Sequence, residues 1–265
     1  MIKKSIYQQE KQDWNQNCSF YVAEERSIFK KLLNQKTLNT FVIKKGKILD
    51  IGCATGHFLN LLPESCQKYG VDFAENFIVY AKKHRPNINF KVAAAEKLPF
   101  KKRSFDGVIF KGTLHHLKAQ GLLTRSLKEA DRVLKSGGKI YIHDRCDSFF
   151  GKLFHQLAIN IRQALKKVNL LKSTSASDNE PEFGLKDLDF LTKSKKYKIL
   201  KSKPIFNIFF FQAVLITNFI QYSLGFWPSE IIRIILLPFI IISEKIFNTK
   251  HFCVEQLIVV EKTKL

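Results

Sequence analysis

The sequence predicts an α/β fold, in which a central β-sheet is flanked by helices. Residues 47–51 form a short apolar run, followed by a turn with two glycines and an apolar helical pattern at residues 57–62. A second strand pattern ends at Asp72, 20 residues after Gly52, and leads into another helical pattern at residues 74–84. Strands that alternate with helices in this way are typical of a parallel sheet.

The turn at residues 52–56 is the candidate ligand-binding loop. A helix start offers free backbone N–H groups, and Gly52 and Gly56 let a ligand approach the backbone closely. Ala54 stands between them, so the turn does not follow the G-x-G-x-x-G dinucleotide pattern. Asp50, where the strand meets the loop, disfavours a phosphate and favours a cation or a hydroxyl donor. Asp72 stands where an acidic residue can bond both hydroxyls of a ribose.

Further strands bring the expected total to seven. Their short apolar patterns lie at residues 89–92, 105–110, 139–143, 197–201 and 254–261. Helical patterns lie between them at residues 122–134, where a Gly-Gly pair follows, and at residues 185–193. Because α/β sheets bind ligands at the carboxyl ends of their strands, the loop after residue 110 should face the same site as the glycine turn.

Four stretches together resemble the class I S-adenosylmethionine-dependent methyltransferases, in particular the type 11-like subgroup that acts on small molecules and lipids. They are residues 48–58, 70–83, 94–117 and 132–142, in the family's order and spacing. The resemblance covers residues 45–145 and implies a Rossmann-like seven-stranded sheet. It also implies methyl transfer as the activity and S-adenosyl-L-methionine as the cofactor.

The resemblance assigns expected roles to individual residues. The loop would cradle the methionine part of the cofactor, with Asp50 near its ammonium group or the loop backbone, and Asp72 would hold the ribose. Phe73 and Ala95 would flank the adenine, and Lys111 would border the methionine end. The family often has an acid where Ala94 stands, so Glu96 is the substitute acceptor for the adenine amine or a solvated residue. The predicted cofactor-binding residues are Asp50, Gly52, Cys53, Ala54, Gly56, Asp72, Phe73, Ala95, Glu96 and Lys111.

His116 is the candidate catalytic residue. A neutral histidine at this rim could take a proton from a hydroxyl nucleophile, whereas a packing role for His115 and His116 is the alternative. A base is not obligatory, since the sulfonium is already an activated electrophile. The loop after residue 110 lacks the Asn/Asp-Pro-Pro-aromatic run of enzymes that methylate exocyclic amines, which argues against adenine-N6 methylation.

The net charge of the chain leaves three readings open. The 265 residues carry a formal net charge of +21, which fits nucleic acid, an anionic membrane surface, or the base composition of an AT-rich genome. Lysine outnumbers arginine, which speaks only weakly for nucleic acid. The five scattered cysteines predict a reducing cytoplasm and no metal site. The start of the chain is polar, so no signal peptide is expected. Nothing in the sequence indicates an oligomeric state.

The expected organisation is an N-terminal helical cap at residues 1–45, a cofactor-binding core at 46–145 and a C-terminal part at 146–265. A helix at residues 23–35 either lids the cofactor or packs on the sheet edge. Residues 153–170 form a basic amphipathic pattern, which fits an interfacial helix, a substrate lid or a helix packed on the sheet.

An apolar insert at residues 204–250 separates the sixth and seventh strands. Residues 204–229 contain no charged residue, and a second apolar run at 231–243 is interrupted by Arg233 and Pro238. If the two strands pair in one sheet, a single membrane crossing is excluded. Interfacial or re-entrant helices, a hairpin, and a buried or oligomeric packing remain. Lysines precede the insert, as expected at a cytoplasmic membrane face: Lys193, Lys195, Lys196, Lys198, Lys201 and Lys203.

These observations predict a cytoplasmic methyltransferase, peripheral or re-entrant at the membrane, with a small or amphiphilic acceptor. A lipid, a quinone or a lipid-linked sugar fits the insert and its basic flank. The alternatives are an RNA methyltransferase and an inactive partner subunit that binds the cofactor.

Overall fold

The computed structural model describes residues 8, 11–15, 18–148, 152, 156, 159–160, 163, 181, 183–193, 196–207, 213, 217, 226–247 and 253–263. Most of the amphipathic pattern expected at residues 153–170 lies outside these residues. Most of the first apolar run, at residues 208–225, also lies outside them.

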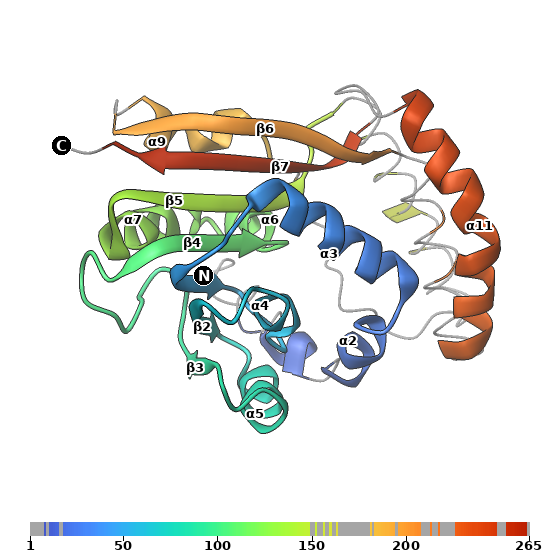
Figure 1. Ribbon diagram of the computed structural model, residues 1–265, viewed down its shortest axis with the longest axis horizontal. Helices are drawn as coiled ribbons and strands as arrows, with labels where there is room; N and C mark the ends of the chain where they lie inside the picture. The colour runs from blue at the N-terminus through green and yellow to red at the C-terminus, as the bar shows by residue number, and fades with distance from the viewer. Residues whose placement is uncertain are drawn as a thin grey trace.

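A seven-stranded sheet forms the centre of the molecule, with strand order β3-β2-β1-β4-β5-β7-β6 (Figure 1). β1 to β5 are parallel, and β7 is antiparallel to both β5 and β6. This confirms the expected Rossmann-like seven-stranded architecture. The strands are β1 Gly46–Ile51, β2 Cys66–Asp72, β3 Asn89–Val92, β4 Phe105–Lys111, β5 Leu134–Arg145, β6 Tyr197–Asn207 and β7 Cys253–Lys262.

Helices cover both faces of this sheet, because successive strand residues point to opposite sides. In β4, Ile109 packs into the core with α3 Ile28–Phe41, α4 His57–Asn60 and α5 Glu75–His84. Val108 and Phe110 pack into the other core, with α6 Leu114–Ala119, α7 Leu123–Val133 and α9 Asp189–Thr192. The remaining helices are α2 Cys18–Glu24, the 3-10 turn η1 Leu185–Leu188 and α11 Phe226–Phe247, which lies beyond the end of β6 in Figure 1.

Two strands are longer than predicted, because their pairing with neighbours outweighs local pattern. β5 begins at Leu134, which pairs with Phe105, and not at residue 139. β6 continues to Asn207, not 201, and stays paired with β7 up to Cys253. Residues 204–207 therefore belong to the sheet and not to the insert.

In the part of the chain that the structure describes, no helix combines the length and apolar character that crossing a bilayer requires. Cys18, Cys53 and Cys66 are free thiols. Cys146 is disulfide-bonded, which the prediction of a reducing compartment did not anticipate.

Candidate functional site

A cavity of about 360 Å³ lies at the carboxyl ends of β1, β2, β4 and β5. Trp14, Tyr21 and Leu33, from the N-terminal region, contribute to its wall, so this region borders the site. Eight of the predicted residues line the cavity: Gly52, Ala54, Asp72, Phe73, Ala95, Glu96, Lys111 and His116. Asp50, Cys53 and Gly56 do not line it; the side chains of Asp50 and Cys53 are buried, and Gly56 lies against the Phe90 ring.

Both predicted glycines are required, because a neighbouring side chain lies too close to leave space for a Cβ. Gly52 has φ +77°, and a Cβ there would lie 2.4 Å from Thr113 Oγ1. Gly56 has φ +76° and begins α4, and its Cβ would lie 2.3 Å from the Phe90 ring. A side chain at either position would push the loop away from the strands that hold it.

Asp72 holds the loop and the next helix in place. Its Oδ2 accepts from the Ala54 N–H at 2.8 Å, and its Oδ1 accepts from the Ala74 N–H at 2.9 Å. Burial raises the pKa of Asp72 to about 6, although these N–H groups act against the shift. Each carboxylate oxygen has two acceptor sites, so Asp72 can accept two further hydrogen bonds from a ligand.

Asp50 is a buried and Lys111 a partly buried titratable residue near the loop. Burial raises the pKa of Asp50 to about 7, and it lowers the pKa of Lys111 to about 7. Among the described residues, Asp50 Oδ1 has no hydrogen-bond partner. A buried acceptor without a donor is costly unless a ligand or water supplies the donor.

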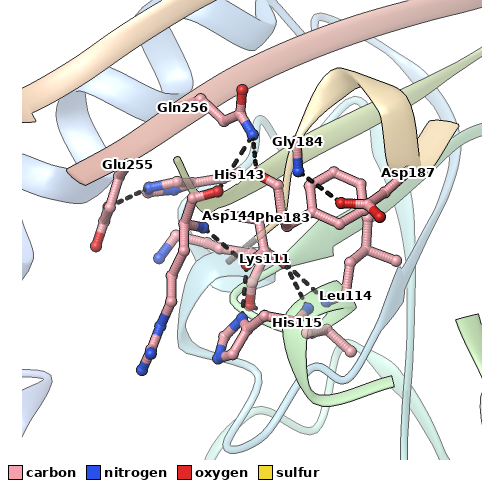
Figure 2. Close-up of polar contacts among 12 residues, drawn as sticks. Lys111, Leu114, His115, His143, Asp144, Phe183, Gly184, Asp187, Glu255 and Gln256 are labelled. Carbon is pink, nitrogen blue, oxygen red and sulfur yellow. Dashed lines mark hydrogen bonds and ion pairs between the residues drawn. The ribbon is translucent and has the colours of Figure 1, made fainter. Parts of the chain in front are cut away.

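His115 and Asp144 form a pair that sequence reasoning missed (Figure 2). His115 Nδ1 lies 2.6 Å from Asp144 Oδ1, and Asp144 Oδ2 accepts from the Leu114 N–H at 2.7 Å. Burial alone would raise the pKa of Asp144, but the facing His115 and backbone N–H groups lower it to about 2. Both residues line the cavity. They are 29 residues apart, so only the pairing of β4 with β5 brings them together.

A second histidine, His143, joins three elements at the same cavity. Its Nε2 lies 2.5 Å from Glu255 Oε2 of β7, and its Nδ1 lies 2.9 Å from Thr37 Oγ1 of α3. Figure 2 shows the contact between His143 and Glu255 beside the His115–Asp144 pair. His143 and Glu255 also line the cavity, and the sequence patterns singled out neither.

His116, the predicted catalytic residue, lies in an aromatic wall. Its ring meets the Trp14 ring edge-on at 5.2 Å, and Trp14 in turn lies 4.9 Å from Tyr21. The packing reading and the catalytic reading of His116 are both compatible with this position.

Glu25 ties the N-terminal helices to the glycine loop. It accepts a hydrogen bond from the Thr55 hydroxyl, and its Oε2 lies 2.6 Å from Arg85 Nη2. Arg85 Nη1 also donates to the Thr55 carbonyl at 2.8 Å. Burial acts against ionisation, but His57, Thr55 and Arg85 together lower the pKa of Glu25.

Comparisons with known proteins agree with this geometry. Residues 49–142 match the model of a family described as a methyltransferase domain. An uncharacterized protein of Methanocaldococcus jannaschii is 34% identical over 55% of this chain and 67% of its own length. A demethylmenaquinone methyltransferase of Chlorobaculum tepidum is 34% identical over 37% of this chain and 40% of its own length.

Two further matches are a tRNA methyltransferase and a solved structure. A tRNA (carboxymethyluridine(34)-5-O)-methyltransferase of Arabidopsis thaliana is 34% identical over 36% of this chain and 23% of its own length. The match therefore spans less than half the length of the Chlorobaculum tepidum and Arabidopsis thaliana methyltransferases. The solved S-adenosylmethionine-dependent methyltransferase of Methanosarcina mazei is 19% identical, with a TM-score of 0.56 over 86% of this chain and 97% of its own. The chain belongs to the class I S-adenosylmethionine-dependent methyltransferases, whose cofactor is S-adenosylmethionine.

Proposed function

We propose that this protein transfers the methyl group of S-adenosylmethionine to a small or amphiphilic acceptor, such as a quinone, a lipid or a lipid-linked sugar. One observation carries the proposal: a single cavity is lined by the carboxylate of Asp72, the glycine loop and the His115–Asp144 pair. The first two suit the cofactor, and the pair suits an acceptor that must lose a proton.

The residues present fit the cofactor. Asp72 has acceptor capacity for the two ribose hydroxyls, and Gly52 and Ala54 of the loop line the same cavity. Asp50 Oδ1 is a buried acceptor that an ammonium group or an ordered water could satisfy. Phe73, Ala95 and Glu96 are the proposed adenine contacts, and Lys111 is proposed to border the methionine end.

The bound cofactor supplies an activated methyl group, so the chain's task is to align the acceptor and exclude water. We propose that His115 takes the proton that the acceptor loses. Asp144 holds its Nδ1–H and stabilises the imidazolium, so Nε2 would take the proton from the acceptor. His116 stays a second candidate, and its contact with Trp14 favours a role in the cavity wall.

Two acceptor classes have support of different kinds. The demethylmenaquinone methyltransferase relative and the apolar C-terminal segment favour an amphiphile. The tRNA methyltransferase relative and the net charge of +21 favour RNA as the second candidate. The scarcity of arginine, which contacts phosphates and bases in a bidentate way, makes RNA the weaker of the two.

A labelling experiment separates the acceptor classes. The full-length protein is incubated with methyl-labelled S-adenosylmethionine and with organic, RNA and small-metabolite fractions of a cell extract. We expect label in the organic fraction and none with the Asp72→Ala variant. Label in RNA would favour the second candidate. Absence of label in every fraction, with S-adenosylhomocysteine still bound, would indicate an inactive partner subunit.

Cofactor affinity should depend on pH through Asp72. Its pKa is raised to about 6, so the carboxylate is ionised above pH 6 and able to accept from both hydroxyls. Below pH 6 it becomes protonated, and affinity should fall by up to about tenfold per pH unit. Titration calorimetry with S-adenosylhomocysteine from pH 5 to 8 measures this. The Asp72→Asn variant should lose the component centred near pH 6, and a flat wild-type profile would contradict the assignment.

A further inference from the structure

α11 presents its apolar side to the solvent. Its six most exposed described apolar side chains are 54–75% exposed: Trp227, Ile231, Ile234, Ile235, Phe239 and Ile242. At 100° per residue these positions fall within a single arc of about 140°. Between Trp227 and Ile242 the arc carries no charged residue, and Lys245 is the charged residue that falls within it near the C-terminal end of the helix. A contiguous exposed apolar face of this kind marks an interaction surface.

The opposite side of α11 faces the protein and includes a buried charged residue. Arg233 is 1% exposed, and its guanidinium lies 2.7 Å from Glu24 of α2 and 3.2 Å from Glu230. Glu230 also accepts from the Ile28 N–H, at the start of α3, at 2.7 Å. Rolling the helix over would break this buried ion pair and leave charges unpaired, at a cost well above that of a surface pair. The apolar side is therefore held outward.

The neighbouring strand β6 carries exposed basic residues. β6 contacts α11, Ile205 and Ile240 belong to the same core, and Lys201 and Lys203 of β6 are exposed. Lys203 is close enough to Lys36 of α3 to help lower the pKa of Lys36, after burial, to about 8. Two copies of this chain meeting here would bring like charges together. An anionic lipid surface offers both an apolar interior and opposite charge.

We infer that the outward face of α11 docks onto the surface of an anionic lipid bilayer, with the helix lying in the interface and the β6 lysines against the headgroups. The surface is separate from the methyl-transfer site, but it bears on the acceptor. α11 holds α2 and α3, and these helices carry Tyr21, Lys30 and Leu33 to the cavity wall. Docking would place this side of the cavity near the lipid.

The test compares vesicle binding of matched variants of the full-length protein. Vesicles of phosphatidylcholine alone, or with phosphatidylglycerol, are separated by flotation at low and high salt. We expect binding to the anionic vesicles, weakened by salt. Ile235→Glu combined with Phe239→Glu should weaken binding by more than tenfold, because two apolar side chains no longer enter the interface. Val79→Glu is the control, since Val79 is equally apolar and 62% exposed, but lies on α5.

Each outcome decides the inference. All variants are first checked for unchanged S-adenosylhomocysteine affinity, which shows that they are folded and is independent of lipid. Equal vesicle binding by the wild type and the α11 variant would overturn the inference. Failure of the wild type to bind any vesicle would also overturn it. In that case, a wild-type dimer that the α11 variant fails to form, as measured by analytical ultracentrifugation, would assign the face to a second copy of the chain. Vesicle binding that resists both salt and alkali would also overturn the interfacial mode.

Discussion

Replacing Asp72 with alanine should raise the Kd for S-adenosylhomocysteine by about 30- to 150-fold, or about 2–3 kcal/mol. The variant would leave two ribose hydroxyls without an acceptor. It would also release the Ala54 and Ala74 N–H groups that Asp72 holds in the structure. Titration calorimetry measures the change, and the far-ultraviolet circular dichroism spectrum shows whether the variant is folded.

The loop and ribose contributions of Asp72 can be separated with a modified ligand. A 2′,3′-dideoxy analogue lacks both hydroxyls, so Asp72→Ala should weaken its binding much less than that of the natural ligand. The coupling between the two changes isolates the ribose contact. Asp72→Asn keeps one acceptor oxygen and should lie between wild type and alanine. If Asp72→Ala is folded and binds the natural ligand as tightly as wild type, the ribose assignment is wrong.

Replacing His115 with glutamine should lower kcat by about 10²- to 10⁴-fold for an acceptor that must lose a proton, with cofactor affinity unchanged. Glutamine keeps much of the size of the side chain but cannot take the proton. An unchanged cofactor affinity would show that the loss of rate does not come from a general loss of packing.

His116→Gln is the matched control for His115→Gln, since the two residues are adjacent and their rings lie 4.1 Å apart. We expect a small effect on kcat, because the edge-on contact of His116 with Trp14 favours a role in the cavity wall. The reverse result would return catalysis to His116. Normal rates in both variants would show that alignment alone drives the reaction, as it can for an activated methyl donor.

Much of the fold follows from short contiguous patterns. The glycine loop and Asp72 each lie within a few residues of a strand end, so local sequence suffices to predict them. The His115–Asp144 pair needs the register of β4 against β5, in which Lys111 lies opposite His143. No local pattern contains that register. The same limit explains why the ends of β5 and β6 were misplaced.

Arg233 shows a different limit. In the sequence it interrupts an apolar run. In the structure it is the inward anchor of α11, and the apolar residues around it point outward. Periodicity defines which residues share a face of a helix, but not which face meets the protein. That choice depends on Glu24, more than 200 residues earlier in the chain.

The Glu25 contacts have a kinetic consequence. Glu25 precedes α3, accepts from Thr55 of the glycine loop and pairs with Arg85 after α5. The segment that borders the cavity and the loop proposed to hold the donor are thus joined by one partly buried carboxylate. We expect exchange of the donor to require that these contacts loosen, and therefore to be slower than exchange of the acceptor. The expected reaction is then ordered, with the donor binding first and its demethylated product departing last.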